Sequence, residues 1–185
     1  DGLSMVLYYS LPPESDSDGD GIPDEPMPIV SFPHGGPWAR DYWGFSSSHQ
    51  WLANRGYAVL SMNFRSSTGF GKGFINAGDR VWGTKILEDQ LDAIEWTIER
   101  GIADRSRVGL MGGSFGGYST LAGLTMHPEH YACGVDIVGP SNLITLLEST
   151  PEYWKPMLTM LTSRVGDHRT EEGRELLTKH SPLSY

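Results

Sequence analysis

The amino-acid sequence predicts an α/β fold in which a mainly parallel sheet is covered by helices on both faces. Apolar runs typical of strands alternate along the 185 residues with segments whose apolar positions recur at helical spacing. Parallel strands need long crossover connections, and helices of about ten residues or more supply them. No internal repeat appears, and the length suits one domain. We therefore expect residues 1–185 to belong to one α/β domain, interrupted by an acidic loop insertion at 14–26.

Five strands are expected from runs of apolar, aromatic and β-branched residues bounded by glycine or proline. They span residues 4–11, 27–32, 57–64, 107–111 and 131–138. The third and fifth runs are almost continuously apolar, which is typical of strands buried on both faces. The single cysteine, Cys133, lies in the fifth run, so we expect a small buried side chain there and no internal disulfide.

Three helices are expected, at residues 46–55, 84–100 and 115–126. The first starts at Ser46 and is followed by Gly56, which is the usual asymmetry of helix caps. The second carries one apolar stripe, because its leucines and isoleucines at 87, 91, 94 and 98 recur at intervals of four, three and four. Residues 141–169 contain two prolines and are expected to be irregular, forming a cap near the active edge of the sheet.

The charge and hydropathy patterns exclude two kinds of partner. The formal net charge is −9, whereas nucleic-acid backbones are bound by clustered lysines and arginines, so no nucleic-acid partner is expected. No stretch reaches the roughly 18 apolar residues of a membrane span, so no membrane partner is expected either. Six acidic residues and no basic ones fall between positions 14 and 25, and they account for −6 of the −9. These patterns leave the oligomeric state open.

A glycine-rich turn surrounds Ser114. The segment GGSFGG at 112–117 follows an expected strand and opens an expected helix, which is the setting of a G-x-S-x-G nucleophile elbow. A Walker-type phosphate loop would need a lysine after the glycines, and none is there. The turn is so sharp that only glycine fits at 112 and 116, and it lifts the Ser114 hydroxyl above the carboxyl ends of the strands. The N–H of Phe115, first in the following helix, can then receive a developing oxyanion.

A second glycine-rich loop, HGGP at 34–37, follows the strand expected at 27–32. In the α/β-hydrolase fold such a loop supplies the second oxyanion donor, which we assign to the N–H of Gly36, with Gly35 as the alternative. The two loops in this chain order therefore predict the α/β-hydrolase fold and a nucleophilic serine. His34 precedes that serine, whereas the catalytic groups of this fold run in the order serine, acid, histidine. His34 is accordingly expected to brace its loop and not to act as the general base.

The acid and the base are not expected among these residues. Asp136 lies inside an expected strand, although the acid of this fold normally follows the next strand along the chain. The histidines after Ser114 lie at helix ends or in polar loops, and none follows a later strand. They are His127, His130, His168 and His180. Four aromatic residues could line the site, although core packing explains them equally well; they are Trp38, Tyr42, Trp43 and Phe70.

Four segments together resemble the catalytic domain of the prolyl oligopeptidase family, and acylaminoacyl peptidases in particular. They are HGGPWARD at 34–41, NFRSSTGFG at 63–71, GGSFGGYS at 112–119 and HSPLSY at 180–185. The resemblance implies a serine peptidase that hydrolyses short or N-acylated peptides through an acyl-enzyme, with Ser114 as nucleophile and the Phe115 and Gly36 amides as oxyanion donors. It implies no required cofactor. The family usually has glycine where Ser66 stands.

The resemblance also implies that the catalytic domain is incomplete. In relatives, a segment like SPLSY leads into a strand bearing the acid, then a helix, a last strand and a loop carrying the histidine, and a β-propeller commonly precedes the domain. We therefore expect the last strands to be missing here, the triad Asp and His to lie beyond Tyr185, and the chain alone to be weakly active or inactive. A carboxylesterase of the same fold, or a catalytically dead interaction module, stays open as an alternative.

The acidic loop carries alternating carboxylates. Its aspartates occupy positions 1, 3, 5 and 9 of a calcium-loop pattern with glycine at position 6; they are Asp16, Asp18, Asp20 and Asp24. Met27 stands at the twelfth position in place of a bidentate glutamate, so Glu25 would have to replace it. The sequence is equally compatible with a structural calcium site and with a solvated hairpin insertion between two strands. Calcium binding would favour an extracellular or periplasmic setting.

Overall fold

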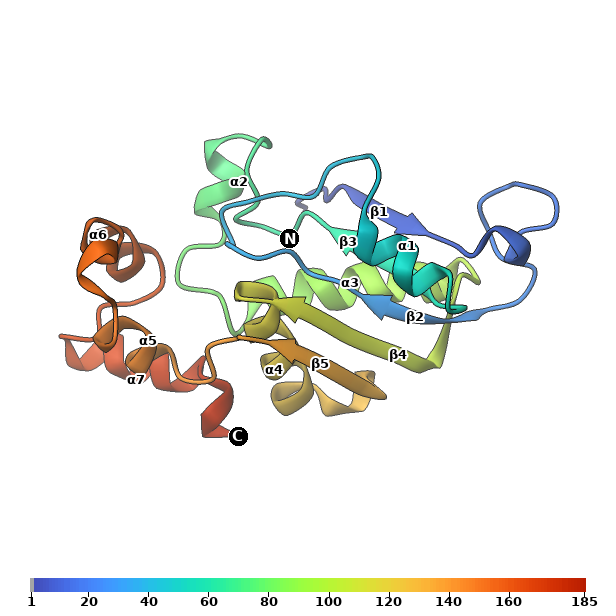
Figure 1. The fold of residues 1–185 in the computed structure, drawn as a ribbon. Helices are drawn as coiled ribbons and strands as arrows, with labels where there is room; N and C mark the ends of the chain where they lie inside the picture. Colours follow the sequence, from blue (N-terminus) through green and yellow to red (C-terminus); the bar gives the residue numbers. More distant parts are fainter. Residues whose placement is uncertain (1) are drawn as a thin grey trace.

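A five-stranded sheet organises the structure, a computed structural model that describes residues 2–185 (Figure 1). Its strands are β1 (Leu7–Ser10), β2 (Met27–Ser31), β3 (Ala58–Met62), β4 (Ala103–Gly113) and β5 (Cys133–Ile137). They lie in the order β1-β3-β2-β4-β5. β1 pairs with β3 in the antiparallel sense, and the other three pairings are parallel. The expected mainly parallel sheet is therefore confirmed.

Helices cover both faces of this sheet. The three expected ones are α1 (Ser47–Ala53), α3 (Lys85–Glu99) and α4 (Phe115–Met126). α1 lies on one face, whereas α3 and α4 lie on the other (Figure 1). The Ser46 hydroxyl caps α1 by accepting a hydrogen bond from the His49 N–H. In the apolar stripe of α3, Leu87 and Ile94 are buried, and Leu91 and Ile98 are half-buried.

The core sits between β3 and the helices α3 and α4. Every residue of β3 is buried, as expected for a strand covered on both faces. At the carboxyl end of the strands the core becomes aromatic, because Phe115 packs against Phe64 at 5.6 Å and against Trp82 at 4.7 Å between ring centroids. Tyr118 lies 5.5 Å from Phe115 and is fully buried. This aromatic cluster fixes the first turn of α4, and with it the position of Ser114.

β5 differs from the expectation. It pairs with β4 on one side, and no other strand in residues 2–185 pairs with its second side. Its residues are consequently exposed or half-buried, so the prediction of a buried strand and of a buried Cys133 side chain is wrong here. Hydrophobicity alone does not distinguish a central strand from an edge strand.

Residues 141–169 also differ, because they are mostly helical. They form α5 (Leu143–Glu148) and α6 (Lys155–Arg164). Two further helices outside this segment, α2 (Lys72–Asn76) and α7 (Glu171–Lys179), were not predicted from the sequence either. Short 3₁₀ turns occupy Pro13–Ser15, Pro128–His130, Glu152–Trp154 and Pro182–Ser184. Pro156 lies in the first turn of α6, where proline costs no helical hydrogen bond. α5, α6 and α7 gather beyond the carboxyl ends of β4 and β5, at the left of Figure 1, where a cap was expected.

No helix within the described residues has the length and apolarity needed to cross a membrane.

Candidate active site

The turn between β4 and α4 holds Ser114 in a strained conformation. Its backbone angles are φ 57° and ψ −115°, and its side chain is exposed. A Cβ on Gly112 would come within 2.4 Å of the Gly116 carbonyl group, and a Cβ on Gly116 would lie 2.2 Å from the Pro33 oxygen. The Ser114 N–H donates to the Ile137 carbonyl at 2.9 Å, so β5 anchors the turn. The geometry is that of a nucleophile elbow, with the hydroxyl raised at the carboxyl edge of the sheet.

Two backbone N–H groups lie beside this serine. Phe115 is the first residue of α4, so its N–H has no carbonyl partner within the helix. Gly36 lines the same cleft as Ser114 and Phe115. Within residues 2–185, no acceptor takes the N–H of either Phe115 or Gly36. Two unpaired amides beside a nucleophile form the arrangement that stabilises an oxyanion.

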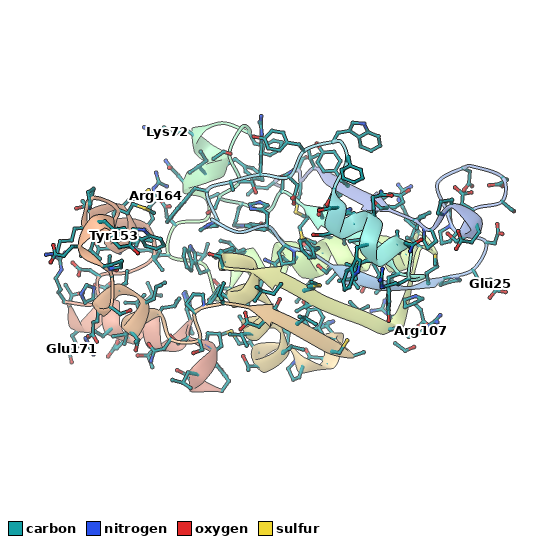
Figure 2. All side chains as sticks on the ribbon, viewed as in Figure 1. Glu25, Lys72, Arg107, Tyr153, Arg164 and Glu171 are labelled. Atoms are coloured by element: carbon teal, nitrogen blue, oxygen red, sulfur yellow. The ribbon has the colours of Figure 1, made fainter. Side chains whose placement is uncertain are left out.

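The cleft beside Ser114 has a volume of about 770 Å³ and mostly apolar walls. Trp38 and Trp82 line its inner side, and Trp154, Met157 and Leu161 come from the segment that includes α6. The segment expected to be irregular therefore builds one wall of the site. Figure 2 shows that wall, with Tyr153 and Arg164 labelled on it, facing the ends of the strands. An apolar side chain of a substrate fits such a cleft.

Of the four aromatic residues considered from the sequence, only Trp38 lines this cleft. Tyr42 and Trp43 line a separate cleft of about 400 Å³ beside β1. Asp41 lies in that second cleft, and burial raises its pKa to about 6. Phe70 packs on Phe74 at 5.3 Å between centroids. The sequence alone could not show which of the four aromatic residues line the cleft beside Ser114, because all four belong to loops whose paths depend on tertiary contacts.

The His34 side chain contacts its own loop and the neighbouring loop that carries Ser67. Its Nδ1 is 2.8 Å from the Gly35 oxygen, and its Nε2 is 2.8 Å from the Ser67 hydroxyl. The ring stacks on Phe64 with 4.3 Å between centroids. Burial lowers the pKa of His34, and the hydrogen bond to Gly35 offsets this only in part. Both ring nitrogens are thus engaged by groups other than Ser114.

No histidine or carboxylate among residues 2–185 bonds to the Ser114 hydroxyl. Asp136 accepts a hydrogen bond from the Gly139 N–H at 2.8 Å, and so shapes the turn after β5. His180 is buried, and its carbonyl oxygen accepts a hydrogen bond from Tyr118 at 2.8 Å. The location of the acid and base beyond Tyr185 stays a prediction.

The acidic loop lies at the far end of the molecule from α6, and Glu25 marks it in Figure 2. Carboxylate oxygens of Asp16, Asp18 and Asp20 lie within 4.8 Å of one another. Asp24 accepts hydrogen bonds from the N–H and the hydroxyl of Ser17, at 3.2 and 2.8 Å, and is not in that group. Three of the four expected calcium ligands are therefore close together, and calcium binding itself stays a prediction.

The fold and the elbow define an α/β-hydrolase fold with a serine at its nucleophile position. The chain belongs to the prolyl oligopeptidase family, because the profile described as "Prolyl oligopeptidase family" matches residues 43–184.

Named relatives agree with this assignment. The chain is 53% identical over 184 residues to dipeptidyl aminopeptidase BIII of Pseudoxanthomonas mexicana, and the match covers 100% of this chain and 27% of that protein. It is 48% identical over 200 residues to dipeptidyl peptidase family member 6 of Caenorhabditis elegans, with the same coverage. The chain thus spans about 27% of the length of these relatives.

A solved structure described as "Acylaminoacyl peptidase in complex with Z-Gly-Gly-Phe-chloromethyl ketone" superposes with a TM-score of 0.85 at 28% identity, over 100% of this chain and 28% of that one. The family and these relatives are serine peptidases. Their names specify different groups, dipeptidyl for the two relatives and acylaminoacyl for the solved structure.

Proposed function

We propose that this protein is a serine peptidase that cleaves short or N-acylated peptides through an acyl-enzyme on Ser114. The observation that carries the proposal is the strained, exposed Ser114 with the unpaired N–H groups of Phe115 and Gly36 in the same cleft. The Ser114 hydroxyl attacks the scissile carbonyl, and the carbonyl oxygen, now negatively charged, accepts hydrogen bonds from those two amides. Collapse of the intermediate releases the amine, and water then hydrolyses the ester.

The proton steps need groups that the described residues do not bring to Ser114. A histidine takes the proton from the Ser114 hydroxyl and returns it to the leaving amine, and an acid orients the histidine. We place both beyond Tyr185, as the family resemblance implies. No metal or other cofactor enters these steps.

The substrate class follows from the cleft and from the relatives' names. The apolar walls formed by Trp38, Trp82 and Met157 favour an apolar residue on the acyl side of the cleaved bond. Dipeptidyl peptidases and acylaminoacyl peptidases differ in whether the substrate begins with a free or an acylated amine. Comparing Ala-Ala-p-nitroanilide with N-acetyl-Ala-p-nitroanilide therefore separates the two specificities.

The decisive test uses the full-length protein and a fluorophosphonate probe, which labels an activated serine. We expect wild-type protein to be labelled, and Ser114→Ala to abolish labelling and lower kcat by roughly 10⁵-fold or more. Ser163→Ala, at an exposed serine of α6, is the matched control and should behave like wild type. Unlabelled wild-type protein would support the dead interaction module. Labelling with turnover of p-nitrophenyl esters, but of no peptide, would support the carboxylesterase.

A further inference from the structure

We propose that the second cleft, beside β1, binds a ligand that carries a guanidinium or primary ammonium group on an apolar stem. The Asp41 carboxylate pairs with the cation, and the aromatic side chains of the cleft contact the stem. The residues that line this cleft differ from those that line the cleft beside Ser114. The inference therefore goes beyond the peptidase function and does not depend on it.

The Asp41 carboxylate has no counter-charge in the part of the chain that the structure describes. Its Oδ2 is buried without a hydrogen-bond partner, and no described group donates to Oδ1, which is not fully buried. Burial raises the pKa of Asp41 to about 6, so near pH 7.5 the carboxyl is ionised but poorly solvated. The Asp41 N–H donates to Asn63 Oδ1 at 2.8 Å, which fixes the backbone of Asp41 at the cleft. A carboxylate in this position is stabilised by a paired cation.

Arg40, the neighbour of Asp41 in the chain, does not supply this charge. Its guanidinium lies over the Tyr42 ring, 4.4 Å from the centroid. Its Nη1 lies so close to Gly69 that a Cβ on that glycine would clash with it. These contacts hold the Arg40 side chain away from Asp41, and no ion pair joins the two residues.

The histidine and the serines that line the second cleft are bonded to one another. His49 Nδ1 lies 3.0 Å from the Ser10 hydroxyl, and His49 Nε2 lies 2.7 Å from the Ser61 hydroxyl. The Ser46 hydroxyl accepts a hydrogen bond from the His49 N–H at 3.3 Å. Burial lowers the pKa of His49, so its ring is neutral near pH 7.5 and does not neutralise Asp41. Among the residues that line this cleft, Asp41 is therefore the one whose charge is left for a ligand.

Exposed aromatic side chains line the same cleft. Tyr42, Trp43 and Phe45 are 68, 84 and 86% exposed. Trp43 packs on Tyr8 with 6.2 Å between ring centroids. Aromatic faces attract cations and also contact the apolar stem of a ligand, so rings beside a carboxylate suit an organic cation. The cleft volume of about 400 Å³ is within the range of small-molecule sites.

The test is isothermal titration of Nα-acetyl-arginine amide into the full-length protein at pH 7.5. The protein carries Ser114→Ala, so that no acyl-enzyme forms. Nα-acetyl-citrulline amide is the matched ligand, because it has nearly the same shape without the charge. We expect the arginine ligand to bind with 1:1 stoichiometry and the citrulline ligand to bind roughly tenfold more weakly.

Two pairs of variants locate the binding. Asp41→Asn should weaken binding of the arginine ligand roughly tenfold, whereas Asp92→Asn, which removes an exposed carboxylate of α3 outside the cleft, should not. Trp43→Leu should weaken binding roughly threefold. Trp51→Leu, at an exposed tryptophan of α1 outside the cleft, should leave it unchanged.

Three results would overturn the proposal: no binding, equal affinity for the two ligands, or unchanged affinity in Asp41→Asn. If binding is absent and Asp41→Asn lowers the free energy of unfolding, a cationic side chain of the full-length protein fills the cleft instead of a ligand. The comparison of the two ligands needs no variant of the cleft, so it decides even if Asp41→Asn does not fold. Labelling of Ser114 by the fluorophosphonate is measured separately, so the peptidase function and the cation site can fail independently.

Discussion

Ser66 shows how a single residue can depart from what its backbone favours. Its φ is 85°, in the left-handed region where glycine is preferred, and glycine is the residue that the family usually has there. The Ser66 hydroxyl is also buried without a hydrogen-bond partner among the described residues. A Cβ on Gly78 would lie 1.8 Å from that hydroxyl, so the side chain has no room to move toward a partner on that side. Both features cost stability.

Replacing Ser66 by glycine should therefore stabilise the protein. We expect Ser66→Gly to raise the free energy of unfolding by about 1 kcal/mol, because it removes the backbone strain and the unpaired hydroxyl. Ser31 is the matched control, since it is equally buried and its hydroxyl has no partner in residues 2–185, but it lies in β2 without a positive φ. Ser31→Gly should lower the free energy of unfolding by a similar amount, because glycine weakens a strand interior. Urea unfolding measures both, and two changes of the same sign would contradict the explanation.

At the residue level, the sequence predicted the candidate catalytic residues better than the residues that pack behind them. Ser114 and Gly36 belong to short motifs whose glycines are required by local backbone geometry. Ser67 lies in the segment 63–71 that resembles the family, but nothing in that segment predicts its contact with His34, which is 33 residues away and depends on how two loops pack. A long-range contact of this kind cannot be predicted from the local sequence around either partner.

At the level of elements, α3 followed from apolar periodicity, the strands from apolar runs and α4 from the glycine-rich turn that precedes it, whereas the helices of the cap were not predicted. α3 and α4 lie within one residue of their expected bounds, α3 because of its apolar stripe and α4, which contains three glycines, because the nucleophile-elbow motif marks where it begins. α7 contains Gly173 in mid-helix, which lowers helix propensity. That glycine is explained only by packing, because a Cβ there would lie 2.0 Å from the Asp167 oxygen. The helix is instead started by Thr170, whose hydroxyl accepts from the Gly173 N–H at 3.1 Å.

The acidic loop has a conformation that can be tested for calcium. Asp16 accepts hydrogen bonds from the N–H groups of Gly19 and Gly21, so the loop already bends around its first carboxylate. If calcium binds, isothermal titration should give heat that Asp18→Ala removes, and the melting temperature should rise by a few degrees at saturating calcium. Peptidase activity should not depend on calcium, because the loop lies far from α6 and the cleft. Absence of heat in the wild-type protein supports the solvated hairpin.

For the molecule as a whole, the cleft combines segments that are distant in the sequence. Gly36 follows β2, Ser114 follows β4, Val138 follows β5, and α6 closes the side. Carboxyl ends of parallel strands meet at one edge of a sheet, so loops after these strands converge whatever their spacing along the chain. That part of the architecture could be predicted from the order of the motifs. The apolar wall formed by Trp154, Met157 and Leu161 could not, because it belongs to a segment that the sequence did not predict to be helical.

Acid should destabilise the whole molecule, because three buried histidines are held neutral. Burial lowers the pKa of His34, His49 and His180 below the ordinary value of 6.5. Below pH 6.5 the unfolded chain therefore takes up protons that the folded chain does not, and the free energy of unfolding falls with the pH. We expect a loss on the order of 1 kcal/mol between pH 7.5 and 5.5, measured by urea unfolding. His49→Gln should make this dependence shallower.

Asp41 has the opposite effect on how the free energy of unfolding depends on pH. Burial raises its pKa from 3.8 to about 6, so below pH 6 the folded chain binds a proton that the unfolded chain does not. This carboxyl therefore adds stability as the pH falls, and it masks part of the loss caused by the histidines. Asp41→Asn should be about 1 kcal/mol more stable than wild type at pH 7.5, after allowance for its partial exposure, and should lose stability more steeply toward pH 5.5. A variant that ran parallel to wild type across this range would mean that Asp41 is ionised at both pH values, and a flat profile in Asp41→Asn would mean that the three imidazoles are not held neutral by the fold.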